Sequence, residues 1–369
     1  MIEQERLPCV ELRNLVKKFP GVVAVNHIDL KVTHGEVFSL LGPSGCGKTT
    51  TLRILAGLEK ADDGEIFIEG ELINAVPPYR RDCNLVFQNH ALFPHMTVEE
   101  NIAYGLERKR VPKSEVRKRV AEMLDFMQLY GMESRYPTQL SGGQQQRVAL
   151  GRSLILKPKL LLLDEPLAAL DRKLRKDMQG ELIRIQQEVG ITFFYVTHDQ
   201  KVALAISDTI AVMKDGKLEQ IGSPEEIYDT PKTRFVADFM GATNIFPGRV
   251  ITRKGEEIKL ETGSGLKLVA LADKASISEE IKGVCVHPER INVLSTGTDA
   301  KMDNQFNGRI VGMIYQGDYV ELKIHLLGSN EYERVTARLD ARLSRKDSFA
   351  VGQEVIVQWD KEGSSALQG

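Results

Sequence analysis

The stretch Gly42-Pro43-Ser44-Gly45-Cys46-Gly47-Lys48-Thr49 decides the fold of the first part of this chain. It matches G-x-x-x-x-G-K-[ST], follows a predicted buried strand over residues 36–41, and opens a predicted helix. Glycines let successive backbone N–H groups converge on phosphate oxygens, and the helix N-terminus adds partial positive charge. We expect Lys48 to reach the β and γ phosphates and the Thr49 hydroxyl to ligate magnesium. The predicted nucleotide-binding residues here are Gly42, Pro43, Ser44, Gly45, Cys46, Gly47, Lys48, Thr49 and Thr50.

Two carboxylates follow a second buried strand. The run Leu160–Leu163 is leucine throughout and predicts a strand covered on both faces, with Asp164 and Glu165 directly after it. A carboxylate at this strand end can hold magnesium, usually through water, opposite the phosphate loop. Glu165 is expected to orient and polarise the attacking water, because phosphoryl transfer needs positioning and charge neutralisation more than covalent help. Capping of the strand is the structural alternative for Glu165.

Two further polar residues come after predicted strands. Gln88 follows the apolar Val86-Phe87 and offers an amide to magnesium or to the attacking water. His198 follows the predicted strand 192–196, and its ring can donate a hydrogen bond to the γ phosphate. Taken alone, Gln88 fits a surface loop and His198 fits a satisfied structural histidine. The ordered series of motifs predicts Glu165, His198 and Gln88 as catalytic, and Thr49, Gln88 and Asp164 as magnesium ligands.

The segment Leu140-Ser141-Gly142-Gly143-Gln144-Gln145-Gln146-Arg147 predicts a second phosphate surface. Its S-x-x-Q pattern is a capping box, so we expect a helix from Ser141 whose N–H groups and dipole can receive an anion. Capping alone explains Ser141 and Gln144. It does not explain two adjacent glycines, which weaken a first turn unless something approaches its backbone closely. One chain then carries two phosphate surfaces, and the second indicates a partner subunit.

The order of predicted elements divides the chain into an α/β part and an all-β part. Alternating strands and helices in the first part predict a parallel or mixed sheet covered by helices, with a helical insert at about 89–158. Beyond residue 235, short β-like runs are punctuated by glycine. The segment Asn244–Val250 is echoed by Asn304–Ile310, so two similar β units are expected to open with the same strand and pack together. Chance remains the alternative for this short repeat.

Composition excludes several classes of protein. The 369 residues are 42% apolar and 27% charged, as in globular proteins, and fill two or three domains. The formal charge of -2 gives no electrostatic case for nucleic acid as a partner. The cysteines Cys9, Cys46, Cys83 and Cys285 form no C-x-x-C pair, which argues against a zinc site or a disulfide framework and favours reduced thiols in the cytoplasm. The charged N-terminal residues and the lack of a long apolar run predict neither secretion nor membrane insertion.

With these motifs in hand, the chain resembles the ATP-binding subunits of ABC transporters of the importer type. The resemblance covers nearly the whole chain and rests on the phosphate loop, Gln88, the Leu-Ser-Gly-Gly-Gln segment, Asp164-Glu165, Asp171 and His198 in the family's order. It implies a P-loop NTPase cassette over 1–235 and a C-terminal OB-like domain of the TOBE type over 236–369. ATP and Mg²⁺ are the implied cofactors, and Phe19 stands where the family stacks an aromatic ring on adenine.

The resemblance also implies partners. Two cassettes would pair head to tail, so that ATP held by one copy is covered by the signature of the other, and the residues implied there are Ser141, Gly142, Gly143, Gln144 and Asp171. The stretch Phe87–Met96 resembles the groove that receives a cytoplasmic helix of a membrane subunit. The implied complex holds two integral permease subunits and an extracytoplasmic solute-binding protein. The chain would then lie peripherally on the cytoplasmic face of the membrane.

The transported solute is the least constrained expectation. The segments Gln88–Met96, Gln144–Gln146 and Gly241–Asn244 most resemble importer subunits for polyamines, and ferric ion, sugar or aminophosphonate uptake stays open. His287 stands where the tail domain usually has arginine. A soluble ABC ATPase acting on ribosomes or DNA is the alternative from another class, and it is disfavoured by the single cassette without long heptad helices. A regulatory tail that binds transcription factors is compatible with transport.

Overall fold

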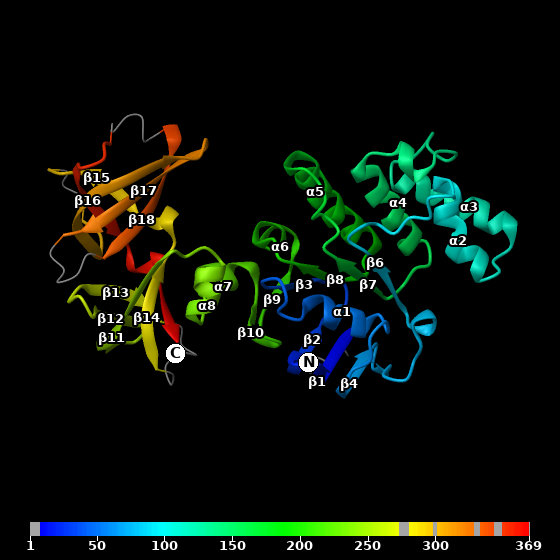
Figure 1. Cartoon of the computed structure of the whole chain (residues 1–369), viewed down its shortest axis with the longest axis horizontal. Coiled ribbons are helices and arrows are strands. Elements are labelled where there is room, and N and C mark those ends of the chain that lie inside the picture. Colours follow the sequence, from blue (N-terminus) through cyan, green and yellow to red (C-terminus); the bar gives the residue numbers. More distant parts are fainter. Residues whose placement is uncertain (1–7, 273–279, 298–300, 328–332, 343–348, 369) are drawn as a thin grey trace, which may run out of the picture. The chain divides into compact units, whose positions relative to one another are not determined.

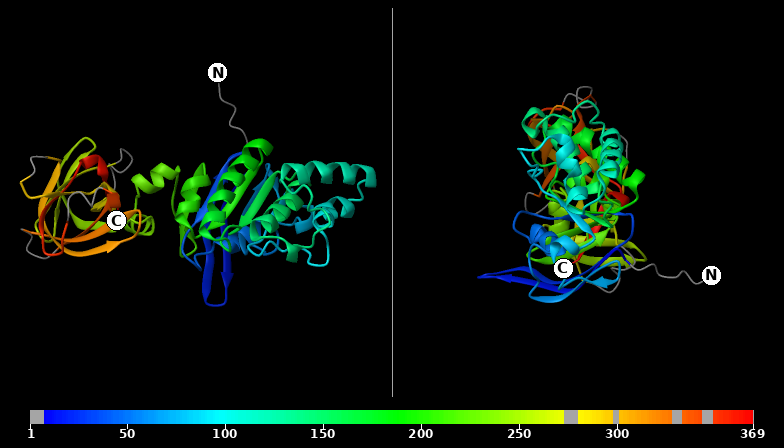
Figure 2. Two further views of the ribbon diagram at one scale, coloured as in Figure 1. Left: turned by 90° about the horizontal axis from the view of Figure 1, so that it is seen from above. Right: turned by 90° about the vertical axis from the view of Figure 1, so that its right-hand side faces the viewer.

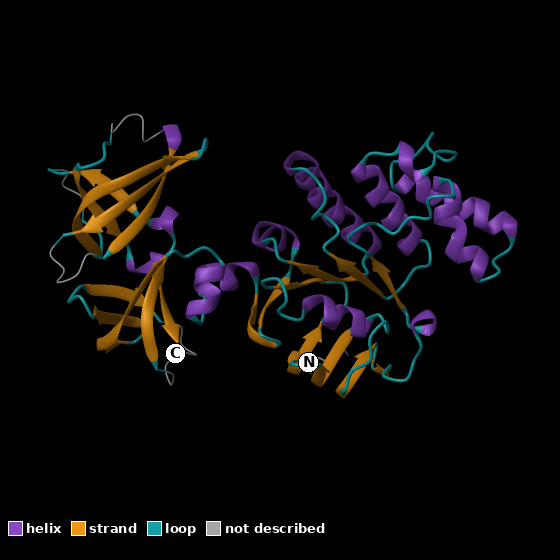
Figure 3. Cartoon of the chain, in the orientation of Figure 1, coloured by secondary structure: helices purple, strands orange, loops and turns teal. Residues whose placement is uncertain are grey.

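The structure is a computed structural model that describes residues 8–272, 280–297, 301–327, 333–342 and 349–368. The chain divides into two compact units, Met1–Pro224 and Glu225–Gly369. Strands and helices alternate in the first unit, whereas strands make up most of the second (Figure 3). The α/β cassette and the all-β tail expected from the sequence are therefore confirmed as fold classes. The residue limits expected for the domains stay a prediction.

Two sheets form the frame of the first unit. A four-stranded antiparallel sheet has the order β2-β1-β4-β5, and a six-stranded sheet has the order β10-β9-β3-β8-β7-β6, parallel except for β10. The strands of the first sheet are β1 (Val10–Phe19), β2 (Val22–Val32), β4 (Asp63–Ile68) and β5 (Glu71–Leu72). Those of the second are β3 (Val37–Leu41), β6 (Cys83–Val86), β7 (Leu160–Asp164), β8 (Thr192–Thr197), β9 (Thr209–Lys214) and β10 (Lys217–Gly222).

Helices cover both faces of the six-stranded sheet (Figure 1). They are α1 (Lys48–Leu55), α2 (Val98–Arg108), α3 (Lys113–Phe126), α4 (Gly142–Leu154), α5 (Arg172–Val189) and α6 (Gln200–Ile206). Short 3-10 turns lie at Pro78–Arg80 and Pro137–Gln139. Helix α2 contacts both α3 and α4, and the three helices form the helical insert.

The leucine run of β7 shows why the sheet is buried on both sides. Leu160 and Leu162 pack toward α1 and the four-stranded sheet, whereas Leu161 and Leu163 pack toward the other helices. All four side chains are fully buried, and each contributes about 1.5–3 kcal/mol relative to an exposed position. Because alternate residues face opposite layers, an unbroken apolar run is the pattern this strand requires.

The second unit contains two β layers. A closed barrel runs β11-β12-β13-β20-β14, and a five-stranded sheet runs β15-β19-β16-β17-β18. The barrel strands are β11 (Asn244–Lys254), β12 (Glu257–Thr262), β13 (Lys267–Leu271), β14 (Ile281–Val286) and β20 (Ser364–Gln368). The sheet strands are β15 (Asn292–Ser295), β16 (Asn304–Tyr315), β17 (Tyr319–Leu326), β18 (Arg334–Asp340) and β19 (Glu354–Trp359). Helices α7 (Pro224–Asp229) and α8 (Arg234–Phe239), with 3-10 turns at Pro288–Arg290 and Lys361–Gly363, complete the unit.

The two repeated segments open β11 and β16, one in each layer. Asn244 of β11 is buried and bonds across to β18, where its amide nitrogen donates to Thr336 O (2.8 Å) and its oxygen accepts from Thr336 N (2.7 Å). Asn304 of β16 makes the reciprocal pair with Val269 of β13, at 2.9 and 2.8 Å. Each layer thus contributes one buried asparagine that bonds to the backbone of the other layer, which holds the two layers together.

Candidate functional site

The phosphate loop has a backbone that only glycine fits at two positions. A Cβ on Gly42 would lie 2.3 Å from Met213 O, and one on Gly47 would lie 2.0 Å from Ala24 O. Gly47 also has a φ of 113°, a conformation that L side chains rarely adopt. The loop leaves the end of β3 and turns directly into α1, as the motif predicts, and its N–H groups therefore gather at the start of a helix.

Lys48 lies folded over this loop. Its ammonium group donates to Gly42 O (2.8 Å) and Pro43 O (2.9 Å), and the side chain is buried. The Cys46 sulfur lies 3.8 Å from the same ammonium, and burial raises the pKa of the Cys46 thiol. The Cys46 thiol is therefore protonated, and its position against the Lys48 ammonium gives it a packing role in the loop.

The three predicted magnesium ligands line one cleft. Thr49 Oγ1 donates to Asp164 Oδ1 at 3.3 Å, which joins the start of α1 to the end of β7. Gln88, at the end of β6, borders the same cleft of about 510 Å³. Burial raises the pKa of the Asp164 carboxyl, with smaller opposing effects from Thr49. A hydroxyl, an amide and a carboxylate converging on a partly buried space form a set of oxygen donors that suits a hard cation.

Glu165 and His198 form a pair beside this edge. Glu165 has a φ of 46°, and its N–H donates to Val196 O at 3.0 Å. Its carboxylate oxygen lies 2.9 Å from His198 Nδ1, across the ends of β7 and β8. The Glu165 side chain is only 17% exposed, whereas His198 is 53% exposed. A held carboxylate next to a solvent-facing imidazole is an arrangement that can orient a water molecule.

The signature segment starts a helix with the predicted capping box. Ser141 Oγ accepts from Gln144 N (3.4 Å), and Gln144 Oε1 accepts from Ser141 N (2.9 Å) at the start of α4. Among the described residues that line the cleft of Thr49 and Asp164, none comes from this segment. The structure therefore does not bring the two predicted phosphate surfaces together around that cleft of one chain.

Asp171 and Phe19 are not among the described residues that line the cleft of Thr49 and Asp164. Asp171 caps α5 by accepting from Lys173 N and Leu174 N, both at 3.0 Å, so a local role accounts for its carboxylate. Phe19 ends β1 and is 42% exposed on the β1–β2 hairpin, which projects from the first unit in dark blue (Figure 2). The Lys17 ammonium lies 5.1 Å from the centre of its ring. The exposed ring fits the stacking position expected of it, and its contact with adenine stays a prediction.

Two features of the site were not predicted from the sequence. Arg53 lines the cleft from α1, one helical turn beyond Thr49, and its charge partly opposes the rise in the pKa of Asp164 that burial causes. The i, i+4 spacing places them on one face of the helix and was the available signal. The glycines of the signature also have a packing reason: a Cβ on Gly143 would lie 2.8 Å from Leu174 Cδ1, and one on Gly142 would lie 3.1 Å from Leu170 Cδ2.

This fold and site define a P-loop ATPase of the ABC cassette class, followed by a β domain. The ABC transporter family model matches residues 25–168, and the TOBE domain model matches residues 284–367. The chain belongs to the ATP-binding proteins of the ABC transporter family, and it is an ATPase that binds ATP through the cassette.

Curated relatives extend the match along the chain. The spermidine/putrescine import ATP-binding protein PotA of Trichormus variabilis is 50% identical over 86% of this chain and 84% of its own length. That of Rubrobacter xylanophilus is 45% identical over 100% of this chain and 96% of its own length. Both units therefore have counterparts in these relatives.

Two solved structures are similar to the first part of the chain. CbiO1 from Clostridium perfringens, part of an ABC transporter complex, is 30% identical with a TM-score of 0.57, covering 60% of this chain and 90% of that one. A dimeric ATP-binding cassette in a post-hydrolysis state with ADP and Pi is 34% identical with a TM-score of 0.52, covering 58% and 98%. Within the part of the chain that the structure describes, no helix is long and apolar enough to cross a bilayer.

Proposed function

We propose that this chain is the ATP-hydrolysing subunit of an importer for polyamines, coupling ATP binding and hydrolysis to the uptake of spermidine or putrescine. The observation that carries the substrate is the 45% identity with a spermidine/putrescine import ATP-binding protein over 100% of this chain. That similarity spans the β domain as well as the cassette. All ABC ATPases share the cassette, so similarity in the cassette alone would not indicate a substrate. Uptake of ferric ion, sugar or aminophosphonate stays the alternative.

The phosphate loop holds ATP in this proposal. Lys48 already bonds two loop carbonyls, and its ammonium can exchange them for β and γ phosphate oxygens, which are stronger acceptors. Thr49, Gln88 and Asp164 would hold Mg²⁺, since their oxygen donors line one cleft. The ion supplies positive charge that neutralises the phosphate oxygens. Arg53 on the same wall keeps the Asp164 carboxyl closer to its charged form.

Hydrolysis depends on the Glu165–His198 pair. The Glu165 carboxylate accepts a hydrogen bond from the attacking water and orients it toward the γ phosphate. The His198 ring nitrogen Nδ1 lies 2.9 Å from that carboxylate and restrains it, and the exposed His198 side chain can donate a hydrogen bond to the phosphate. The left-handed backbone of Glu165 and its bond to Val196 O fix the direction of the side chain. Because these contacts preset the carboxylate, little reorganisation is needed at the reaction step.

A second copy of the chain would complete the site. The start of α4 offers the N–H groups of Gly142 and Gly143, which a helix start leaves without intrahelical partners. This surface does not line the cleft of its own chain, so it is available to the ATP of a partner. The similar cassette bound to ADP and Pi is a dimer, which supports the arrangement.

We propose that the segment Phe87–Met96 contacts the membrane subunits. Phe87 is exposed, and Phe93 packs against Tyr104 of α2 with ring centres 4.6 Å apart. Arg152 of α4 donates to His90 O (3.0 Å) and Ala91 O (2.8 Å), so movement of this surface is carried to the signature helix. We infer that a short helix of each of two permease subunits docks here, with the chain peripheral on the cytoplasmic face. A solute-binding protein outside the membrane delivers the polyamine.

Reconstitution tests the proposed function. The chain, its cognate permease subunits and the solute-binding protein are placed in proteoliposomes, and ATP hydrolysis is measured with putrescine, spermidine, maltose, ferric ion or aminoethylphosphonate. Stimulation by polyamines supports the substrate. Stimulation by another solute alone would contradict the substrate while leaving the importer role intact. Hydrolysis that no permease or solute alters would contradict the coupling.

A further inference from the structure

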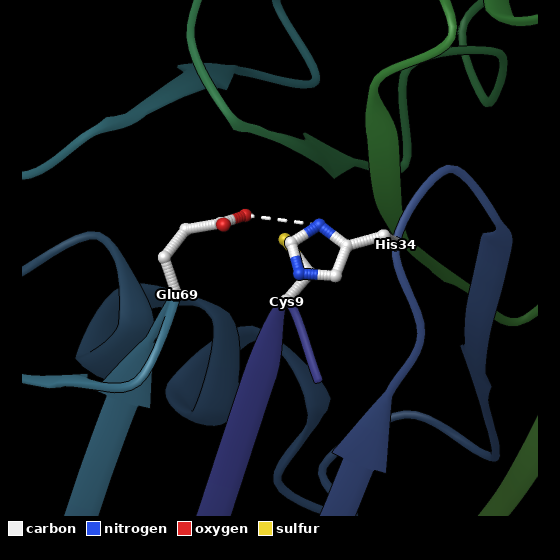
Figure 4. A group of neighbouring side chains, drawn as sticks. All are labelled: Cys9, His34 and Glu69. Carbon is white, nitrogen blue, oxygen red and sulfur yellow. Dashed lines mark ion pairs between the residues drawn. The ribbon is translucent and has the colours of Figure 1, made fainter. Parts of the chain in front are cut away.

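Three different metal-binding side chains form a group that includes none of the described residues lining the nucleotide cleft. Figure 4 shows this group. Cys9 directly precedes β1, His34 lies in the connection between β2 and β3, and Glu69 lies in the turn between β4 and β5. Their ligand atoms, the Cys9 sulfur, a His34 ring nitrogen and a Glu69 carboxylate oxygen, all lie within 4.8 Å of one another. Three segments far apart in sequence therefore aim a thiol, an imidazole and a carboxylate at one point.

The spacing is close to that of a zinc site. Zinc bonds of about 2.0–2.3 Å in tetrahedral geometry place neighbouring ligand atoms roughly 3.3–3.8 Å apart. His34 Nδ1 and Glu69 Oε1 are already 3.1 Å apart and form an ion pair when the ring is protonated. An ion would separate these two atoms slightly and bring both closer to the sulfur. The His34 and Glu69 side chains are 39% and 34% exposed, so rotation about their side-chain bonds can make this change.

Backbone contacts hold the three segments in place. Glu69 N donates to Cys9 O at 2.9 Å, so the carboxylate and the thiol are fixed on adjoining residues of paired strands. Gly35 N donates to Thr192 Oγ1 at 3.0 Å, which anchors the loop of His34 against β8. These bonds place the ligands on rigid elements, and only side-chain torsions remain free. Little ordering is therefore required on binding, which favours affinity.

Exposure and chemistry point to the same type of ion. The Cys9 side chain is fully buried, while the His34 and Glu69 side chains are 39% and 34% exposed and lie over it. An ion can therefore arrive from solvent, bind the imidazole and carboxylate, and reach the sulfur. Thiolate and imidazole ligands select Zn²⁺ or Co²⁺ over Mg²⁺ and Ca²⁺. A thiolate and a carboxylate together balance the charge of a divalent cation.

We propose that Cys9, His34 and Glu69 form a binding site for a zinc-type divalent cation at the end of the four-stranded sheet, with water as the fourth ligand. Binding releases the Cys9 thiol proton to solvent, replaces the weak contact of that thiol with Lys159 O at 3.8 Å, and forms the metal–sulfur bond. Burial raises the pKa of the Cys9 thiol to about 12, so the thiol is protonated until an ion arrives. The bound ion ties β1, β4 and the β2–β3 connection together.

The absence of a C-x-x-C pair in the sequence does not oppose this site. That spacing reports cysteines that ligate as neighbours, whereas this site has one cysteine and two ligands that only the fold brings to it. It is also separate from the oxygen donors Thr49, Gln88 and Asp164, which suit a harder ion. The two sites therefore differ in the cation that they select.

Cobalt titration of the full, untagged chain tests the proposal in buffer with excess Mg²⁺. We expect one equivalent of Co²⁺ to give a thiolate-to-metal charge-transfer band, which Zn²⁺ abolishes on displacing it. Cys9→Ala is expected to remove the band. His34→Gln and Glu69→Gln, which change exposed side chains, are each expected to weaken Zn²⁺ binding by more than about 10–100-fold. That range is the loss typical of mutating a residue that only hydrogen-bonds to a metal ligand. Zn²⁺ is also expected to raise the Tm of the wild type but not of Cys9→Ala.

Cys83→Ser is the matched control, since Cys83 of β6 is also buried but contacts Leu55 O of α1 and does not belong to the group. It is expected to keep the band. A band that persists in Cys9→Ala, or its absence from the wild type, would overturn the proposal. Full Zn²⁺ affinity in both His34→Gln and Glu69→Gln, which lie at the surface and leave the fold intact, would show that the group is an ion pair over a buried thiol.

Discussion

Two helices of the first unit, α1 and α4, have glycine at their N-termini, but the side chains around these two N-termini differ. At α1 the glycines come with Lys48, Thr49 and a carboxylate across the cleft at Asp164. At α4 the glycines come with a reciprocal cap between Ser141 and Gln144 and no basic residue in the first turn. Both starts can receive phosphate, but only the first carries the charge and the oxygen donors that hold ATP and its cation.

The comparison teaches that the chain carries two unlike halves of a site. The α1 half binds by charge, whereas the α4 half offers only backbone N–H groups and one hydroxyl. The α4 half can contact ATP once the α1 half of another copy already holds the nucleotide, as in an antiparallel pair of copies. Changes at α1 should therefore affect ATP binding, and changes at α4 should affect what happens after binding.

Lys48→Ala has the largest expected effect. Loss of the ammonium removes charge-assisted hydrogen bonds to two phosphates, so the ATP affinity of the isolated chain is expected to fall about 100-fold or more. Calorimetric titration of ATP measures it, with the exposed Lys113→Ala as the control. Unchanged binding by Lys48→Ala would remove the distinction between the two helix starts.

Glu165→Gln is expected to leave ATP affinity intact while lowering steady-state hydrolysis about 100-fold or more. The amide keeps the shape of the side chain but no longer accepts a proton from water. Phosphate release under saturating ATP measures the effect, and Glu188→Gln on the exposed end of α5 is the matched change. Near-normal turnover would assign the orienting role to another group.

Ser141→Ala is expected to lower turnover by roughly 10–100-fold, the value of a hydrogen bond to a charged group, without changing ATP affinity. It also removes a helix cap worth about 1 kcal/mol of unfolding free energy. Thr97→Ala is the matched control, since Thr97 and Glu100 form the same capping box at α2. Urea unfolding should give similar losses of stability for both variants. Equal turnover in both would show that Ser141 is only a cap.

Gly143→Ala is expected to lower the free energy of unfolding by only about 1 kcal/mol, because the new methyl meets the end of the flexible Leu174 side chain. Leu174→Ala in the same chain relieves that contact. We expect the double variant to regain stability but not turnover, since the methyl still blocks the approach of phosphate. Recovery of both quantities would make helix packing the whole reason for the glycine.

The sequence predicted those helices, strands and loops that are marked by a motif or a spacing within their own residues. The loop at Gly42–Thr49, the run at Leu160–Leu163 and the capping box at Ser141 each hold their own periodicity or spacing, and the structure has the expected strand or helix at each. The clustering of Thr49, Gln88 and Asp164 at one edge also followed, because parallel strands end on the same side of a sheet.

Features that depend on distant segments were not predicted. The contact of Gly143 with Leu174 joins two helices whose packing angle no local pattern encodes. The paired hydrogen bonds between Asn244 and Thr336 depend on the register of two layers, and the repeat alone predicts only one strand in each layer. The group of Cys9, His34 and Glu69 likewise forms only when three strand ends meet.

Sedimentation of Glu165→Gln saturated with Mg-ATP tests the head-to-tail pairing most directly. The account predicts a dimer under these conditions, and a monomer when Ser141→Arg is added, although that second chain still binds ATP. A Glu165→Gln chain that binds ATP and sediments as a monomer, alone and with its permease subunits, would contradict the pairing.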